Sequence, residues 1–170
     1  MLDKNQSPGA ESLVPLKDML TYRLARLNAK LSAQASRILK DSAEISLGQW
    51  RILVFLDVYD TCKMTDFVRF SGFDKGQVSR NVSELIKLGL VAAERSETDQ
   101  RTQNLSMTPL GRQTFERARP AMRRRQAALL ETLSEDERVM FYFIIEKLED
   151  VAGAAPEIFV AEDAGSGSTE

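Results

Sequence analysis

Polar side chains that can bond phosphates or the edges of bases gather between positions 75 and 81. They are Lys75, Gln77, Ser79, Arg80 and Asn81. Apolar side chains recur through the same region at three- and four-residue spacing: Val78, Val82, Leu85 and Ile86. This period predicts an amphipathic helix over Lys75–Leu88, with the polar set opposite the apolar stripe. Such a face offers hydrogen bonds and ion pairs to a polyanion.

The residues on either side predict how this helix is held. Asp74 stands where an N-cap belongs, and Gly89 follows the last apolar residue as a C-cap signal. Thr65–Phe70 predicts a short preceding helix that runs into the Ser71-Gly72 turn. Two helices joined by a tight glycine-containing turn form a helix-turn-helix, whose second helix can enter the DNA major groove.

Two strand-like segments follow, Leu90–Arg95 and Thr102–Met107, and they predict a β-hairpin that adds a wing. The loop between them is charged and holds no apolar residue, so its tip should project into solvent. We expect Asp99 to orient the guanidinium of Arg101, which enters the minor groove, where negative potential attracts arginine. The alternative is that the two side chains only pair with each other and stiffen the wing.

Catalytic and metal-binding residue patterns are missing from the sequence. The chain has no histidine, which is the commonest general base and metal ligand. It has no phosphate-binding glycine loop and no nucleophile elbow. Asp57 and Asp60 resemble the solvated end of a helix, and Cys62, at a helix-to-helix junction, is interpreted as an inert thiol rather than an oxidant sensor. We therefore expect no enzyme, no catalytic residue, no metal site and no cofactor.

Composition restricts the partners. The formal net charge is -2, so contact with DNA must rest on a local basic surface. No apolar run is long enough to span a membrane, and the first residues lack the layout of a signal peptide. We expect a cytoplasmic protein that does not associate with membranes.

Long helices are predicted on both sides of the winged segment. An apolar stripe predicts the first helix: Leu13, Leu16, Leu20, Leu24, Leu27, Leu31, Ala35 and Ile38. Leu47–Val58 predicts a second helix with Ser46 as its N-cap. After the wing, Pro109–Leu133 predicts a helix that Pro120 would kink, and a capping box at Ser134 starts a final helix.

The expected fold is mainly α with a small β-wing. The flanking helices hold more apolar surface than one small winged domain can cover, which predicts a two-fold homodimer. The expected organisation is a flexible N-terminus at 1–12, dimerisation and support helices at 13–62, the winged helix-turn-helix at 63–108, C-terminal dimerisation helices at 109–155 and a flexible acidic tail at 156–170.

The motifs of this region resemble the MarR family of bacterial transcription regulators. The resemblance covers roughly Leu47–Gly111 and rests on DKGQVSRNVSELIKLGLV, on D-x-R in the wing, and on LSMTPLG. The proline at position 109 departs from the family pattern, but the first turn of a helix accepts proline. The resemblance implies a triangular homodimer, with interlocked terminal helices and two winged lobes, that binds a pseudo-palindromic operator in double-stranded DNA.

The resemblance also implies a repressor of a neighbouring operon that a small ligand releases. Family members commonly bind anionic aromatics between the dimerisation helices and the winged lobe, and here Arg23 and Arg26 could clamp a carboxylate while Trp50 stacks on the ring. The alternative for Trp50 is a place in the core. A winged-helix protein–protein module without DNA binding is the rival function. The candidate DNA contacts are Thr65, Lys75, Gln77, Ser79, Arg80, Asn81, Arg95, Asp99 and Arg101.

Overall fold

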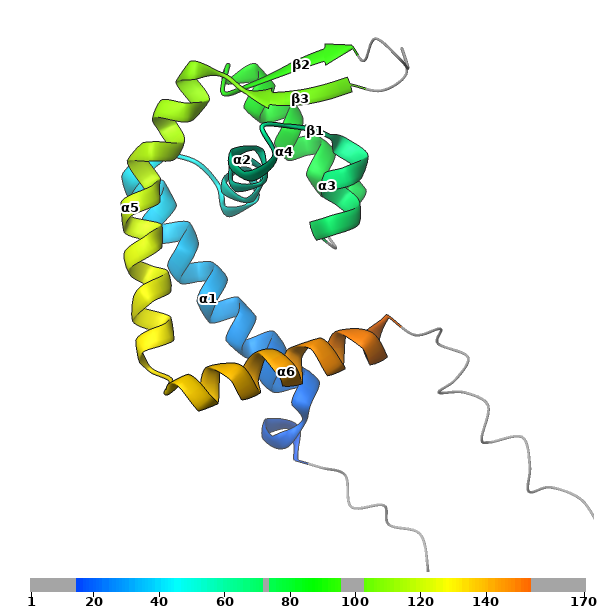
Figure 1. The fold of residues 1–170 in the computed structure, drawn as a ribbon, viewed down its shortest axis with the longest axis vertical. Coiled ribbons are helices and arrows are strands. Elements are labelled where there is room, and N and C mark those ends of the chain that lie inside the picture. The colour runs from blue at the N-terminus through cyan, green and yellow to red at the C-terminus, as the bar shows by residue number, and fades with distance from the viewer. Residues whose placement is uncertain (1–14, 72–73, 96–102, 154–170) are drawn as a thin grey trace, which may run out of the picture. The chain divides into compact units, whose positions relative to one another are not determined.

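The computed structural model describes residues 15–71, 74–95 and 103–153 (Figure 1). The described chain is mainly helical with one small antiparallel sheet, which confirms the predicted fold class. Its elements are η1 (Leu16–Asp18), α1 (Leu20–Ala43), α2 (Leu47–Tyr59), β1 (Thr61–Lys63), α3 (Met64–Ser71), α4 (Lys75–Lys87), β2 (Val91–Arg95), β3 (Gln103–Met107), α5 (Pro109–Glu131) and α6 (Glu135–Ala152).

Side-chain caps begin three of these helices, as the sequence predicted. The Ser46 hydroxyl accepts a bond from the Gln49 N–H at 3.2 Å, and the Gln49 side chain accepts one from the Ser46 N–H, so a capping box starts α2. Ser134 and Glu137 form the same box at α6. Hydrogen bonds to the backbone and side chain of Ser134 hold the pKa of the exposed Glu137 carboxyl below its ordinary value.

The sheet has the order β1-β3-β2, and both pairings are antiparallel. Strands β2 and β3 are the predicted wing, with Val91 opposite Met107 and Arg95 opposite Gln103. Strand β1 was not predicted. Cys62 therefore lies within a strand, opposite Leu105, and not at a direct junction of two helices. Three residues are too few to show an alternating pattern, and only the pairing with β3 defines this strand.

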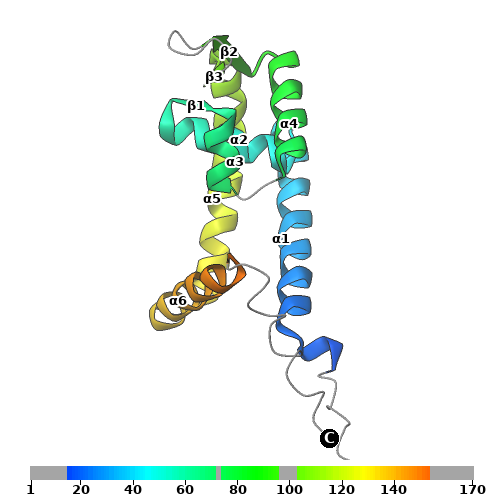
Figure 2. The same cartoon turned by 90° about the vertical axis from the view of Figure 1, so that its right-hand side faces the viewer.

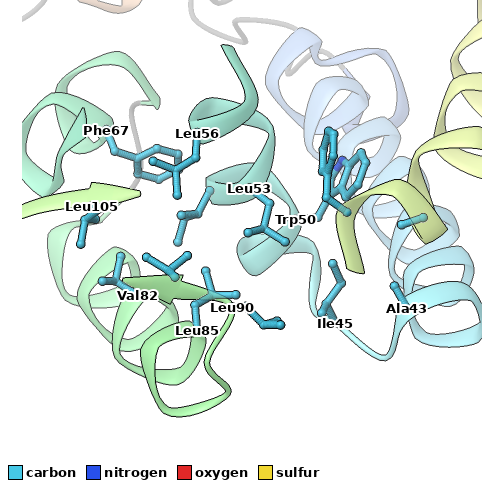
Figure 3. Close-up of a cluster of buried hydrophobic side chains, with 14 of the residues drawn as sticks. Ala43, Ile45, Trp50, Leu53, Leu56, Phe67, Val82, Leu85, Leu90 and Leu105 are labelled. Atoms are coloured by element: carbon cyan, nitrogen blue, oxygen red, sulfur yellow. The ribbon is translucent and has the colours of Figure 1, made fainter. Parts of the chain in front are cut away.

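One core joins α1 to the winged segment, and α2 runs through its middle (Figures 1 and 3). Leu39 of α1, Leu53 and Leu56 of α2 and Leu85 of α4 have no exposed surface. The Trp50 ring is 8% exposed and stacks on Phe115 of α5, with 4.9 Å between ring centroids. The core interpretation of Trp50 is thereby confirmed.

The flanking helices differ in detail from the predictions. Helix α1 begins at Leu20, after η1, rather than at Leu13, which lies outside the described residues. Helix α5 includes Pro120, and the predicted kink there stays a prediction. Asp57 is not merely the solvated end of a helix, because it forms an ion pair with Arg112 of α5.

Two compact units make up the chain, one through Arg123 and one from Arg124. The first contains the winged segment, α1, α2 and the start of α5. The second contains the end of α5 and α6, and α6 has no buried residue. The domain boundaries predicted from sequence stay a prediction. None of the helices in the described part of the chain combines the length and apolar character that crossing a membrane requires.

Candidate nucleic-acid interface

Helix α4 presents one buried and one exposed face. Val78, Val82 and Leu85 are buried in the core, as their spacing predicted. Ile86, assigned to the same stripe, is instead exposed. The polar candidates at the start of the helix are accessible: Lys75, Gln77 and Arg80 are exposed and Ser79 is half-buried. The first two turns of α4 therefore offer a charged, hydrogen-bonding surface to a groove of DNA.

The N-terminus of α4 is fixed by its cap. The Asp74 carboxylate accepts a bond from the backbone N–H of Gln77 at 2.9 Å, which confirms the predicted N-cap. This bond satisfies one of the amide groups that a helix start leaves without a partner. It defines where the exposed turn of α4 begins.

Polar side chains and a glycine set the contact between α2 and α4. The Asn81 amide donates to the Gln77 carbonyl oxygen at 2.9 Å, and the Ser46 hydroxyl lies 3.4 Å from the Asn81 Oδ1. A Cβ on Gly48 would lie only 2.6 Å from the Asn81 Nδ2, so no larger residue fits there without movement. Gln49 adds a bond to Glu84 at 3.1 Å. The structure thus turns Asn81, a candidate DNA contact, toward α2, and its DNA contact stays a prediction.

The other end of α4 carries a Schellman motif. Gly89 has a φ of +70°, a backbone conformation that favours glycine. The N–H of Leu90 bonds the Leu85 carbonyl oxygen, and that of Gly89 bonds the Ile86 carbonyl oxygen, both at 2.9 Å. The predicted C-cap signal is confirmed. Because the chain reverses here, β2 starts directly from the end of α4.

Thr108 and Gly111 connect the base of the wing to α4 and α5. The Thr108 hydroxyl donates to the Gly89 carbonyl oxygen at 2.6 Å and accepts from the Gly111 N–H at 3.0 Å. A Cβ on Gly111 would lie 2.0 Å from the Leu90 carbonyl oxygen. The LSMTPLG motif therefore has a structural cause: it brings α5 against the end of α4. The sequence alone does not reveal this role, because Gly89 and Leu90 precede the motif by many residues.

The remaining candidate DNA contacts lie at the edges of the described chain. Thr65 is exposed in the first turn of α3. Arg95 is the last residue of β2. Asp99 and Arg101 lie outside the described residues. None of these four roles is tested by the geometry, and all four stay predictions.

The candidate ligand residues do not form one site within a chain. Arg23 and Arg26 line an open pocket of about 400 Å³ on the first half of α1, together with Tyr22. Trp50 packs in the core that contains Ala43, at the opposite end of α1. Arg26 precedes Ala43 by 17 residues, and the helical rise separates them by about 25 Å. The sequence showed the residue types, but not that the helix between them is unbroken.

The lone cysteine is buried. Loss of solvent around the thiol, followed by the charge of Asp66, raises the pKa of Cys62 to about 11. Oxidation proceeds through the thiolate, so a thiol that stays protonated at neutral pH favours the inert interpretation. In the described residues, no group of three or more Cys, Asp and Glu side chains could hold a metal ion.

Comparison with known proteins agrees with this architecture. The model of the MarR family matches residues 44–102. The HTH-type transcriptional regulator BilQ of Clostridium symbiosum (strain WAL-14163) is 27% identical over 104 residues, which are 61% of this chain and 72% of BilQ. The segment that matches the family model includes α2, α3, α4 and β2.

Solved structures share the fold at lower identity. A MarR/EmrR family transcriptional regulator from Acinetobacter sp. ADP1 superposes with a TM-score of 0.75 at 24% identity, covering 82% of this chain and 98% of that one. Bordetella bronchiseptica BpsR, whose DNA binding is regulated by 6-hydroxynicotinic acid, superposes with a TM-score of 0.72 at 22% identity, covering 81% and 97%. Residues 44–102 are thus similar to the MarR family of transcriptional regulators, the curated relative is a regulator of the helix-turn-helix type, and the fold is the winged helix fold of solved MarR-family structures.

Proposed function

We propose that this regulator binds a pseudo-palindromic operator as a homodimer and represses a neighbouring operon until a small ligand releases it. The observation that carries the proposal is the exposed face at the start of α4, where Lys75, Gln77 and Arg80 are accessible while the opposite face is buried. Helix α2 bonds the second half of this helix through Gln49 and Glu84, and the base of the wing holds its C-terminal end through Thr108. Each lobe would place α4 in a major groove.

The other contacts follow from this placement. Ser79 bonds a base edge or phosphate beside Arg80, and Thr65 and Arg95 bond the backbone on either side of the groove. Arg101, oriented by Asp99, enters the adjacent minor groove. Asn81 contributes by holding α4 against α2, and contacts DNA only if its amide leaves the Gln77 carbonyl oxygen.

Exposed apolar surface supports the dimer. In α6, Val139 is 65% exposed and Phe143 is 53% exposed, and Met140 and Tyr142 beside them are also exposed. The first half of α1 has no buried residue, and it extends away from α2, α3 and α4 (Figure 2). Exposed apolar patches on soluble proteins mark sites of interaction, including protein–protein interfaces. A second copy of the chain covers both helices in the proposed dimer.

A small anionic aromatic compound is the proposed effector. Two observations support it: the DNA binding of BpsR is regulated by 6-hydroxynicotinic acid, and the pocket on α1 combines Arg23, Arg26 and Tyr22. Arginine pairs with a carboxylate through two parallel bonds. Trp50 joins such a site only if its ring leaves the stack with Phe115. Binding shifts the population toward a form whose two α4 helices no longer fit successive grooves.

Titration of DNA from beside the chain's own gene tests the DNA role. We expect tight binding by the wild type and a loss of about 1–3 kcal/mol per lost contact for Arg80→Ala. Arg37→Ala, which removes an exposed arginine from α1, is the matched control and should bind as the wild type does. If no duplex binds, or if Arg80→Ala binds unchanged, α4 is not a DNA-reading helix and the protein–protein module becomes the better account.

Benzoate and 6-hydroxynicotinate are suitable probes of the effector. Either compound should release the DNA, and Arg26→Gln should require a higher concentration while binding DNA normally. Arg37→Gln serves as the control. Release by neither compound, or equal release from Arg26→Gln, would contradict the proposed clamp. Transcription from the neighbouring promoter in the presence of the protein tests repression.

A further inference from the structure

We propose that Gly76 is a specificity-determining residue: it leaves the centre of the DNA-reading face without a side chain, so that a base pair and the Arg80 guanidinium can share that space. The inference rests on the proposed entry of α4 into the major groove. It concerns a residue that the sequence analysis did not assign to the interface.

The outer stripe of α4 consists of Gly76, Arg80, Ser83 and Lys87. These residues follow one another at steps of four, three and four, so at 3.6 residues per turn they share one face. All four are exposed, and the buried Val78, Val82 and Leu85 lie opposite. In the first two turns Arg80 is thus the only long side chain on the stripe, with glycine before it and serine after it.

Packing requires glycine less strictly at position 76 than at the packed Gly48 and Gly111. A Cβ would meet backbone at 2.0 Å on Gly111 and an amide at 2.6 Å on Gly48. On Gly76 the nearest atoms are the Asp74 Oδ1 at 3.1 Å and an Arg80 guanidinium nitrogen at 3.9 Å. Its backbone has no positive φ, so alanine fits the same conformation. Within a helix, glycine is the poorest residue after proline.

The position of Arg80 adds a second observation. Its guanidinium reaches back toward the N-terminus of α4, because one of its nitrogens lies 3.9 Å from where a Cβ of residue 76 would be. Side chains on helices lean in this direction. A planar guanidinium can bond the O6 and N7 atoms of guanine together. A side chain at position 76 would crowd the guanidinium and hold the base pair away from the helix.

The test uses duplexes that the wild-type full-length protein enriches from a randomised DNA pool. We expect Gly76→Ala to bind the enriched duplex about tenfold more weakly, the size of one lost base contact. Gly76→Gln, with a longer side chain, should lose more and should relax the base preference at one position in each half-site. The melting temperature of Gly76→Ala should be equal or higher. Gly153→Ala, an exposed glycine at the end of α6, is the matched control with unchanged binding.

A second pair of variants separates this role from crowding of the helix cap. Asp74→Ser keeps a capping hydroxyl but shortens the side chain. If Gly76 serves only the cap, Gly76→Ala lowers the melting temperature, and its DNA loss disappears when measured in the Asp74→Ser background. Under our inference the melting temperature does not fall and the tenfold loss persists in that background.

The results separate failure of the proposed DNA function from failure of the proposed role of Gly76. If the wild type enriches no duplex, the proposed DNA function fails and the inference with it. If it enriches a duplex that Gly76→Ala and Gly76→Gln bind equally well and with the same base preference, the DNA function stands and the role of Gly76 is overturned. If Gly76→Ala reduces DNA affinity less in the Arg80→Ala background than in the wild type, the two residues share the same space, since the effects of coupled residues are non-additive.

Discussion

In the winged lobe (α2 to β3, Leu47–Met107), large apolar side chains are buried within one chain, whereas in α6 and the first half of α1 they are exposed. Leu53 and Leu85 have no exposed surface, while Val139 is 65% exposed. The residue types and their helical spacing are alike in the two regions. The difference teaches that an apolar stripe in a sequence can be buried within its own chain or left exposed on it, and that only packing distinguishes the two cases.

Removing core volume from the lobe should have the largest effect on stability. Leu53→Ala should lower the free energy of unfolding by about 2–5 kcal/mol, because it leaves a cavity among residues that cannot fully collapse. Val58→Ala, on the exposed side of the same helix, is the control and should cost less than about 0.5 kcal/mol. Urea unfolding measures both. Equal effects would mean that α2 does not run through a packed core.

Polar substitutions in α6 should instead act on association. Val139→Ser with Phe143→Ser should weaken the dimer by roughly 2 kcal/mol per buried anchor, about thirtyfold each in the dissociation constant. The helical content of the lobe should not change. Sedimentation velocity over a range of concentrations measures the shift, with Glu146→Gln as the control on the same helix. A double variant that dimerises like the wild type would place the interface elsewhere.

The DNA contact of the wing can be tested separately from the stability of the lobe, because Thr108 anchors the base of the wing. Arg101→Ala should cost about 1–3 kcal/mol of DNA affinity, more on A·T-rich than on G·C-rich flanks, with little change in stability. Asp99→Ala should cost less, and the double variant hardly more than Arg101→Ala alone, because Asp99 acts through Arg101. Strictly additive losses would show that the two residues act separately.

The smallest effect is expected at Cys62. Its pKa is raised to about 11 in the folded chain, so the thiol stays protonated when the unfolded chain begins to lose its proton near its ordinary pKa of 9.0. The stability contributed by this shift is complete below that ordinary value and declines as the pH rises through it. Native protein at neutral pH should react slowly with a thiol reagent, and urea should accelerate the reaction. Rapid native labelling would contradict a buried thiol.

Signals that lie within one helical turn were predicted correctly from the sequence. Asp74 caps α4, Gly89 ends it, and Ser134 starts α6, because each acts on backbone groups a few residues away. The wing hairpin was predicted for the same reason, as its strands are close in sequence. Most predicted helix bounds differ from the observed ones by one or two residues, and the largest shift is at the start of α1, where no side-chain cap is present.

Features that depend on distant residues were missed. Strand β1 exists through its pairing with β3, more than forty positions later. Asn81 looked like an exposed polar residue until Gly48 and Ser46 of the α2 start were found beside it. Asp57 likewise forms its ion pair with Arg112, a residue that is distant in the sequence. Gly76 was missed for another reason: its proposed role lies in the side chain that it lacks.

Changing the spacing between half-sites tests the central claim most directly, since the claim is that two winged lobes joined by their flanking helices read one operator. Once a duplex has been enriched by the wild type, inserting about five base pairs at its centre rotates one half-site by half a helical turn, and inserting about ten restores the rotation. The account predicts that the half-turn insertion abolishes high-affinity binding and that the dimer binds the original duplex as one unit. Unchanged affinity after the half-turn insertion would contradict it, because the lobes would then bind DNA independently of each other.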